Sequence, residues 1–242
     1  MIEFLLLDLD DTILDFHRAE RAALADTLER FGMEPEEETL ALYHKINIWH
    51  WEQLEKGAMT RPQVLVGRFR MLLEALGRTA EPEKLAADYE QGLAQGFFLL
   101  PGAEEALERL RGRCRIFLMS NGTSQVQRSR LAGTNLYRFF EGVFISQEVG
   151  FNKPEKAFFD ACFGRIPGFH REKALMVGDS LTSDIQGGIN AGVKTVWVNP
   201  GGRKSGGIKP DYEIEALSGL PGLLDRLDAE KYILGGNQDG GI

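Results

Sequence analysis

The sequence has few cysteines, no long apolar run and no dense cluster of basic residues. Its 242 residues include only two cysteines, Cys114 and Cys162, which lie far apart and in no metal-binding spacing. We therefore expect two reduced thiols in a cytoplasmic protein, without a disulfide framework. The apolar run near the N-terminus is interrupted by Asp8 and is too short to span a membrane, so no membrane association is expected.

An excess of basic residues is also absent, since the net charge is −8 at pH 7. This charge argues against a nucleic acid polymer as a main partner. It leaves room for a small anionic substrate, because local cations decide whether such a molecule binds. The length fits one large α/β domain, or a core with a smaller second domain, in a monomer or a homodimer.

The sequence does contain, near its start, a short apolar segment (residues 4–7) that ends in acidic residues. Because neither face of this segment is polar, it is predicted to be a buried strand of a parallel sheet. Asp8 and Asp10 lie two residues apart and project to the same side of an extended backbone, where their charges repel. A hard divalent cation such as Mg²⁺ relieves this repulsion. The alternative is that Asp10 and Asp11 only form a turn or cap a helix.

The next part of the chain, residues 16–97, carries helical patterns only. Apolar residues at helical spacing predict helices at 16–31, 36–54, 60–76 and 82–97, and glycines follow the first three of them. Because no strand pattern separates these helices, the block is predicted to be a four-helix domain inserted after the first strand.

From residue 98 onward, strands and helices alternate. Strands are predicted at 114–119, 142–146, 174–177, 194–198 and 212–214, with helices between them. This order predicts an α/β fold, a Rossmann-like open parallel sheet with helices on both faces. The core domain is expected to combine residues 1–15 and 98–228, and the glycine-rich residues 229–242 are expected to form a mobile tail.

Acidic residues follow two of the predicted strands, and ligands of such sheets bind beyond the carboxyl ends of the strands. Asp179 comes shortly after the strand at 174–177, and Asp184 lies in the same loop. Together with Asp8 and the neighbourhood of Asp10, these acids can surround one Mg²⁺. The alternatives are a turn residue for Asp179 and an acid favoured by the helix dipole for Asp184.

A second polar group has the chemistry to bind phosphate. Ser120 offers a hydroxyl, and the backbone N–H groups at Asn121 and Gly122 can cradle an oxyanion where a strand meets a helix N-terminus. Lys153 precedes another predicted helix, and the order of the sheet would bring it to the same edge. The alternative for Lys153 is a solvated surface residue.

Taken together, these segments resemble the haloacid dehalogenase (HAD) superfamily of phosphohydrolases. The matching pieces in chain order are 8–12 (DLDDT), 120–122 (SNG), 153–154 (KP) and 178–179 (GD) with Asp184. The resemblance covers residues 2–227 and makes the helical block a cap domain of the family's first type. True dehalogenases lack the second acid of the first segment, which is Asp10 here, so the expected substrate is a phosphate ester.

The resemblance implies hydrolysis through a covalent aspartyl-phosphate. Asp8 would be the nucleophile, and Asp10 would donate a proton to the leaving alcohol and then accept one from water. Asp8, the backbone carbonyl of Asp10 and Asp179 would hold Mg²⁺, with Asp184 supporting the site. The transferring phosphoryl group would be bound by the polar residues of the other two segments, namely Ser120, Asn121, Gly122 and Lys153.

Residues 178–200 (GDSLTSDIQGGINAGVKTVWVNP) narrow the resemblance to the house-cleaning pyrimidine 5′-nucleotidases. This likeness implies a small phosphorylated substrate, a pyrimidine nucleoside monophosphate. Within the same superfamily, a sugar-phosphate phosphatase or a phosphomutase is the alternative. A non-catalytic phosphate-binding protein is a more remote alternative, because such proteins should lack Asp8 or Asp10.

Substrate choice is expected to reside in the cap domain, in its most aromatic stretch. A base could stack on Trp49 or Trp51, and Asn47 or His50 could form hydrogen bonds with its edge. The alternative is that these side chains fill the helical bundle. The other three histidines show no spacing typical of metal ligands, and we assign them no role: His17, His44 and His170.

Overall fold

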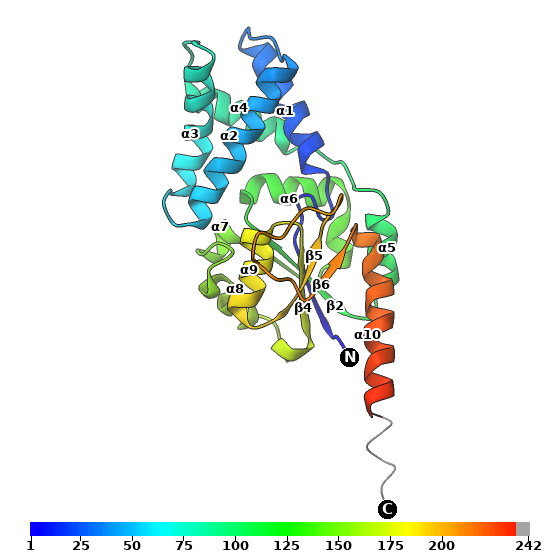
Figure 1. The fold of residues 1–242 in the computed structure, drawn as a ribbon. Coiled ribbons are helices and arrows are strands. Elements are labelled where there is room, and N and C mark those ends of the chain that lie inside the picture. Colours follow the sequence, from blue (N-terminus) through cyan, green and yellow to red (C-terminus); the bar gives the residue numbers. More distant parts are fainter. Residues whose placement is uncertain (236–242) are drawn as a thin grey trace, which may run out of the picture. The chain divides into compact units, whose positions relative to one another are not determined.

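The computed structural model describes residues 1–235, which form two compact units (Figure 1). The core unit consists of Met1–Leu14, Leu99–Asn121 and the residues from Leu136 onward. The helical unit consists of Asp15–Phe98 and Gly122–Asn135. The helical unit therefore contains a second segment in addition to the predicted range 16–97. This segment, residues 122–135, had been expected in the core.

A six-stranded parallel sheet forms the centre of the core unit. Its order is β3-β2-β1-β4-β5-β6, so the first strand lies in the middle and the chain crosses over between neighbours. The strands are β1 (Phe4–Leu7), β2 (Arg115–Ser120), β3 (Gly142–Ile145), β4 (Ala174–Gly178), β5 (Lys194–Val198) and β6 (Tyr212–Ile214). The predicted α/β fold with an open parallel sheet is confirmed, and each predicted strand is present within about one residue of its expected ends.

Helices cover both faces of this sheet. Alternate strand residues such as Leu6 and Met176 pack in one cluster with α8 (Lys156–Phe163) and the end of α9 (Gln186–Ala191). Residues of opposite orientation, such as Leu5, are equally buried, and α5 (Ala103–Leu110) and α10 (Leu220–Gly235) lie on that other side (Figure 1). Burial on both faces explains why the strands are almost continuously apolar.

Two helices of the core unit differ from expectation. The short helix α7 (Ser146–Val149) directly follows β3 and was not predicted, because four residues are too few for a periodic pattern. Helix α10 continues to Gly235, beyond the predicted end at 227 and into the range expected to be a mobile tail. The rest of that expected tail, residues 236–242, lies outside the described residues.

The helical unit contains the four predicted helices and one more. They are α1 (Phe16–Arg30), α2 (Glu37–Glu55), α3 (Arg61–Ala75), α4 (Pro82–Leu93) and α6 (Ser124–Gly133). A cluster of buried side chains joins α1, α2, α3 and α4 and includes Tyr43, Phe69 and Tyr89. Val126 of α6 belongs to the same cluster, which explains why residues 122–135 group with these helices.

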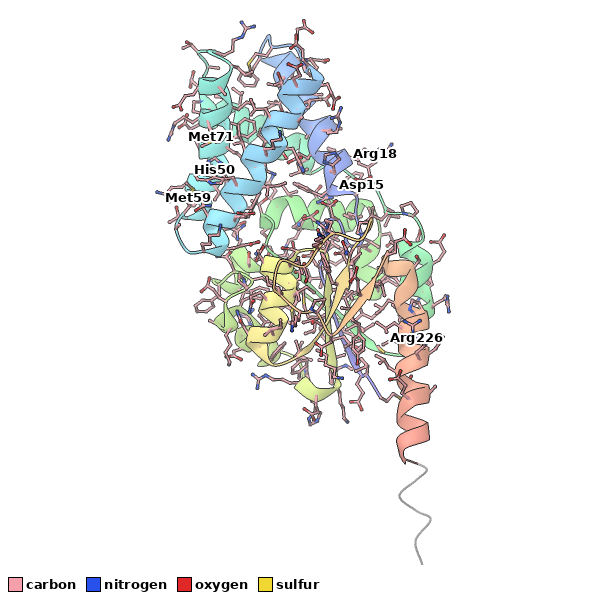
Figure 2. All side chains as sticks on the ribbon, viewed as in Figure 1. Asp15, Arg18, His50, Met59, Met71 and Arg226 are labelled. Carbon is pink, nitrogen blue, oxygen red and sulfur yellow. The ribbon has the colours of Figure 1, made fainter. Side chains whose placement is uncertain are left out.

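Local signals fix the starts of two of these helices. The side chain of Asp15 accepts a hydrogen bond of 2.8 Å from the backbone N–H of Arg18, and both residues are labelled in Figure 2. At the start of α3, the backbone N–H of Thr60 donates a hydrogen bond of 2.8 Å to the side chain of Gln63. These caps satisfy N–H groups that lack intrahelical partners. In the described part of the chain, every helix is too short or too polar to cross a bilayer.

Candidate active site

Three neighbouring strands bring the predicted acidic and phosphate-binding segments to one edge of the sheet. β1 lies between β2 and β4, with Leu7 paired with Leu118 on one side and Val177 on the other. Asp8 continues this ladder, because its backbone N–H donates a hydrogen bond of 2.9 Å to the carbonyl of Val177. The carboxyl ends of all three strands therefore meet beside Asp8.

Lys153 lies at this edge and is buried, with 1% of its surface exposed. Its Nζ donates to Asp8 Oδ1 at 2.5 Å, to Asp184 Oδ1 at 2.7 Å and to the carbonyl of Met119 at 2.7 Å. All three donor positions of the ammonium group thus have acceptors. This geometry excludes the alternative of a solvated surface lysine.

Asn121 fixes the backbone that carries Lys153. Its Oδ1 accepts a hydrogen bond of 2.9 Å from the N–H of Lys153, and its Nδ2 donates one of 2.9 Å to the Lys153 carbonyl. Ser120, the last residue of β2, is buried at 1% exposure. Gly122 groups with the helical unit, where a Cβ would lie 2.3 Å from Nε2 of Gln127, so a larger residue would require the Gln127 side chain to move.

The predicted acids converge on one small region. Asp8, Asp179 and Asp184 each offer a carboxylate oxygen, and these oxygens all lie within 4.8 Å of one another. Asp184 is held by Lys153 and by the backbone N–H of Ser180, which donates to its Oδ2 at 3.1 Å. Asp184 therefore lies within the acid group itself, and its support of a metal site stays a prediction.

A glycine at the end of β4 makes this convergence possible. A Cβ on Gly178 would lie 2.2 Å from Oδ2 and 2.3 Å from Cγ of Asp184, which is closer than any real contact. On the other side of the group, Asp11 has a backbone φ of 54°, a left-handed conformation that aspartate tolerates better than most residues. For Asp11, the alternative of a turn residue is therefore the correct description.

Burial raises the pKa values of two of these acids, Asp8 and Asp179. Burial raises the pKa of Asp8 despite the opposing ammonium of Lys153, and the charges of Asp184 and Asp10 add to the increase. Burial also raises the pKa of Asp179 well above its usual range, with further contributions from Asp184 and Asp8. For Lys153, burial alone would lower the pKa, but the two neighbouring carboxylates outweigh it and raise the pKa.

The donor set fits a divalent cation that prefers oxygen. Asp8 and Asp184 are buried and pair with the ammonium group of Lys153, and the half-buried Asp179 adds a third carboxylate, so negative charge is in excess. Such an excess is very unfavourable in a buried site without a further cation. Mg²⁺ takes carboxylate oxygens and keeps positions for water and substrate oxygens. The side chain of Asp10 lies outside this carboxylate group. The metal-binding prediction for Asp10 concerned its backbone carbonyl, and the predicted role of its side chain was proton transfer.

Comparison with known proteins identifies the family. The model of the haloacid dehalogenase-like hydrolases matches residues 2–192. The chain belongs to this family. It is therefore an enzyme, a hydrolase, and the resemblance drawn from its four short segments is confirmed.

Individual relatives cover nearly the whole hydrolase. It is 39% identical to HAD-hydrolase YfnB of Bacillus subtilis over 222 residues, 91% of this chain and 94% of YfnB. It is 36% identical to pyrimidine 5′-nucleotidase PynA of Streptococcus pneumoniae over 231 residues, 95% and 98% of the two chains. It is 38% identical to pyrimidine 5′-nucleotidase YjjG of Escherichia coli over 183 residues, 75% and 80% of the chains.

A solved structure of YfnB is also similar to the hydrolase. Its TM-score is 0.89, and the match covers 93% of this chain and 99% of that chain. That crystal structure is of YfnB bound to magnesium. The likeness supports the same α/β core with the same order of elements in both proteins.

Two residues of the hydrolase that the sequence analysis missed hold the backbone of Asp179. Trp197 Nε1 donates a hydrogen bond of 2.9 Å to the Asp179 carbonyl, and Arg203 Nη2 donates one of 3.1 Å to the same atom. Asn199 in turn accepts a hydrogen bond of 3.2 Å from Nε of Arg203. The position of this segment in the chain could have indicated the contact. Residues 199–207 follow β5, the neighbour of β4, so they begin at the edge of the sheet where β4 ends.

The predicted specificity residues lie on α2 of the helical unit and differ in exposure. Asn47 and His50 are each 2% exposed, whereas Trp49 is 42% exposed. Trp51 is half-buried, and the guanidinium of Arg61 lies 5.6 Å from its ring centre. Nδ1 of His50, which is labelled in Figure 2, donates a hydrogen bond of 2.8 Å to the carbonyl of Ile46. The rings of Trp49 and His50 lie edge to face with their centres 4.9 Å apart, and the role of the four side chains in specificity stays a prediction.

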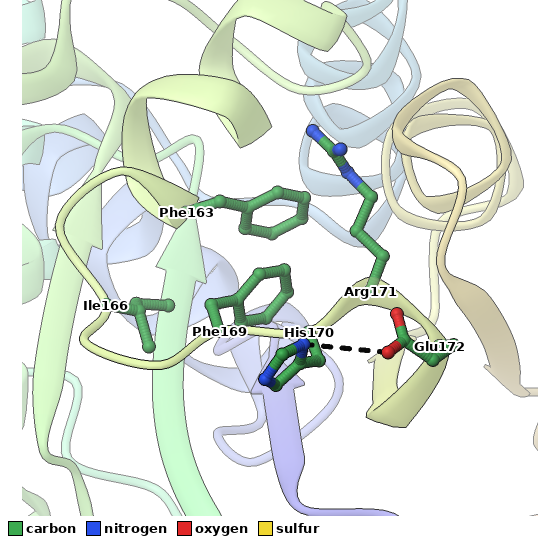
Figure 3. A pocket seen from close by; sticks show the side chains of 6 residues that line it. All are labelled: Phe163, Ile166, Phe169, His170, Arg171 and Glu172. Carbon is green, nitrogen blue, oxygen red and sulfur yellow. Dashed lines mark ion pairs between the residues drawn. The ribbon is translucent and has the colours of Figure 1, made fainter.

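A separate surface pocket of about 400 Å³ lies in the core unit (Figure 3). It is lined by Phe163, Ile166, Phe169, His170, Arg171 and Glu172. Residues 171–173 directly precede β4, so the pocket lies near the amino end of that strand. Because the acids occupy the carboxyl end, we assign this pocket no part in the candidate active site.

Proposed function

We propose that the hydrolase is a Mg²⁺-dependent phosphomonoesterase that works through an aspartyl-phosphate and acts on pyrimidine nucleoside monophosphates. One observation carries this proposal more than any other. A buried lysine, Lys153, bonds directly to Asp8 inside a group of carboxylates at the carboxyl edge of the sheet. The ammonium of Lys153 opposes the rise that burial causes in the pKa of Asp8, and so favours the charged carboxylate that acts as a nucleophile.

The first half of the reaction transfers the phosphoryl group to Asp8. An oxygen of its carboxylate forms a bond with phosphorus while the bond to the ester oxygen breaks. Asp10 donates a proton to the leaving alcohol. Ser120, Asn121 and Gly122 contact the phosphoryl oxygens. Phosphate monoesters hydrolyse extremely slowly without a catalyst, so a site dense in stabilising charge is physically reasonable.

The second half returns the enzyme to its starting state. Asp10, now deprotonated, accepts a proton from water as the water oxygen attacks phosphorus, and the bond to Asp8 breaks. Lys153 keeps its contact with Asp8 and offsets the returning negative charge. Inorganic phosphate leaves, and every proton is accounted for by the change in Asp10.

Asp8, the backbone carbonyl of Asp10 and Asp179 would hold Mg²⁺, with Asp184 adjoining them. When bound, the ion would cancel repulsion between the acids and the substrate phosphate. The magnesium bound by YfnB and the excess of carboxylates over cations both support this assignment. The free thiols of Cys114 and Cys162 fit the expected cytoplasmic location.

The substrate class rests on the relatives and on the cap. PynA and YjjG, at 36% and 38% identity, are named as pyrimidine 5′-nucleotidases. In this chain, Trp49 and Trp51 offer partly exposed aromatic surface on which a base can stack. Asn47 and His50 are proposed to complete the specificity region, although both are buried in the described structure.

A panel of phosphate esters tests the proposal. We expect kcat/KM for pyrimidine nucleoside monophosphates to exceed that for hexose phosphates by at least about tenfold, the size of about 1.4 kcal/mol of differential binding. A preference for hexose phosphates would contradict the proposed nucleotidase activity and would still be consistent with a phosphatase. Removing Mg²⁺ with a chelator should stop phosphate release, and undiminished turnover would remove the metal from the mechanism.

A further inference from the structure

A second group of metal-ligating side chains lies in the helical unit, on α1 and α2. His17 and Glu20 lie three residues apart on the same face of α1, and His44 comes from α2. One ligand atom from each lies within 4.8 Å of the others. This group could not be predicted from residue spacing, because 24 residues separate Glu20 from His44.

Glu20 is the fixed member of the group. Its side chain is 2% exposed, and its Oε1 accepts a hydrogen bond of 2.7 Å from Nδ2 of Asn47. Asn47 is held by Arg68, whose Nη1 donates to its Oδ1 at 2.9 Å, and Arg68 pairs with Glu90 at 2.6 Å. This relay fixes the orientation of the carboxylate, as hydrogen-bonded neighbours of metal ligands usually do.

The other oxygen of Glu20 is directed at the two imidazoles. Oε2 lies 2.5 Å from Nδ1 of His44 and 3.9 Å from Nδ1 of His17. Among residues 1–235, no lysine or arginine forms an ion pair with Glu20. A buried carboxylate without a fixed cationic partner is unfavourable, so this oxygen calls for a positive charge.

The two distances fit a metal ion after small side-chain movements. Ligand bonds of about 2.0–2.1 Å in a tetrahedral site place neighbouring ligand atoms about 3.3 Å apart. The observed separations of 2.5 Å and 3.9 Å lie on either side of that value. The side chains of His17 and His44 are 53% and 33% exposed, so an ion can enter from solvent and keep water as a further ligand.

We infer that His17, Glu20 and His44 form a binding site for a divalent transition-metal ion of the zinc class. Two imidazole nitrogens and one carboxylate are a donor set typical of zinc and unsuited to Mg²⁺, which prefers oxygen. The ion takes the place of the proton between Glu20 and His44. That proton moves to Nε2 of a neutral His44, or to solvent from a protonated one. The bound ion then links α1 to α2.

Zinc binding by the full chain tests this inference. We would strip the protein of metals, saturate it with millimolar Mg²⁺ and titrate it with Zn²⁺, and with Co²⁺ as a spectroscopic probe. We expect one ion per chain, with Co²⁺ giving the visible bands of nitrogen coordination. The variants His17→Gln and His44→Gln should each raise the dissociation constant at least about tenfold. Both side chains are partly exposed, so the fold should be retained and is checked by circular dichroism.

Two further variants separate this site from others. His170→Gln is the matched control, because His170 also lies beside a glutamate, Glu172 at 3.6 Å, but without a second histidine. It should bind zinc as the unmodified protein does. Asp179→Asn weakens the acid group of the core and should leave zinc binding intact. The inference is overturned if no zinc binds in the presence of Mg²⁺, if His17→Gln and His44→Gln bind it unchanged, or if Asp179→Asn abolishes binding.

Discussion

The core unit gathers three carboxylates around one ammonium group, whereas the helical unit sets one buried carboxylate between an amide and two imidazoles. In the core, Lys153 contacts Asp8 and Asp184 directly. In the helical unit, Arg68 reaches Glu20 only through Asn47. Both arrangements leave a carboxylate oxygen that a positive ion would stabilise, and they differ in the chemical type of the remaining donors.

This difference teaches that donor type, more than the amount of buried charge, separates the two groups. The acids of the core offer oxygen alone to an ion, and they come from the rigid ends of β1 and β4 and the loop that follows. Oxygen donors at such an edge suit Mg²⁺ and phosphate chemistry. The nitrogen donors of the helical unit lie on helix faces, where a bound ion would link α1 to α2 without any part in catalysis.

The largest effect is expected from Asp8→Asn. This change keeps the shape of the side chain and removes the charged oxygen that attacks phosphorus, so phosphate release should fall by at least about 10³-fold. The fold should survive, because Lys153 still pairs with Asp184. Steady-state phosphate release measures the activity, and circular dichroism checks the fold.

The matched control for this prediction is Asp26→Asn, which changes an exposed aspartate on α1. It should leave activity unchanged within about twofold, because a surface charge contributes little. If Asp8→Asn retained more than about a tenth of the activity, the nucleophile would have to be another residue.

The second prediction compares two of the buried cations, Lys153 and Arg68. Lys153→Met leaves Asp8 and Asp184 buried without their ammonium partner and should lower the free energy of unfolding by about 3–5 kcal/mol near pH 8. Arg68→Met should cost less, about 1–3 kcal/mol, because its partner Glu90 is 22% exposed and can be solvated. Urea unfolding of both variants measures the difference.

The stabilities of Lys153→Met and Arg68→Met should also differ in their dependence on Mg²⁺ and pH. Millimolar Mg²⁺ should restore part of the stability of Lys153→Met and none of that of Arg68→Met, because only the core acids bind it. Burial already raises the pKa of Asp8. The folded protein therefore holds that proton more tightly than the unfolded chain, and Lys153→Met, which lacks the opposing ammonium, should hold it more tightly still, so its loss of stability should shrink as pH falls through about 8. Equal responses of the two variants to Mg²⁺ would contradict this account.

Much of the fold could be predicted because the controlling signals are local. Apolar runs of strand length ending in polar residues located β1, β2 and β4, and helical spacing with flanking glycines located α1 to α4. The grouping of residues 122–135 with the helical unit could not be predicted. It depends on packing of Val126 against helices that are distant in sequence.

The core of the site was predictable for a related reason. Parallel strands end at one edge, so Asp8, Ser120 and Asp179 had to meet there once the sheet order was known. The hydrogen bonds from Trp197 and Arg203 to the Asp179 carbonyl were not predicted, because a side chain that bonds to a distant carbonyl leaves no pattern in the sequence. The same limit hid the contact between Glu20 and His44.

A third prediction tests how tightly the acid group of the core is packed. In Gly178→Ala the new Cβ would overlap Asp184, so the carboxylate must move and kcat should fall by about 10- to 100-fold. Gly222→Ala is the matched control, since a Cβ there meets nothing within 4 Å and lies in helix α10. It should leave kcat unchanged and keep or slightly raise stability. An active Gly178→Ala enzyme would show that Asp184 need not lie in its observed place.

The smallest effect is expected from His50, which shares α2 with His44 but donates to a backbone carbonyl. Burial lowers its pKa, with the charge of Arg68 adding to the effect and the hydrogen bond to Ile46 opposing it. As pH falls below about 6.5, the unfolded chain binds a proton at this histidine before the folded chain does, so the folded state loses stability. His50→Gln should remove this loss, which we expect to be at most about 1 kcal/mol.

Urea unfolding near pH 7.5 and near pH 5.5 measures this difference. The unmodified protein should lose more stability on acidification than His50→Gln, while His170→Gln, at an exposed histidine of the core unit, should behave like the unmodified protein. If all three lost the same amount, burial of His50 would have no part in the acid sensitivity of the helical unit. A positive result would show that burial of His50 contributes to the acid sensitivity of the helical unit.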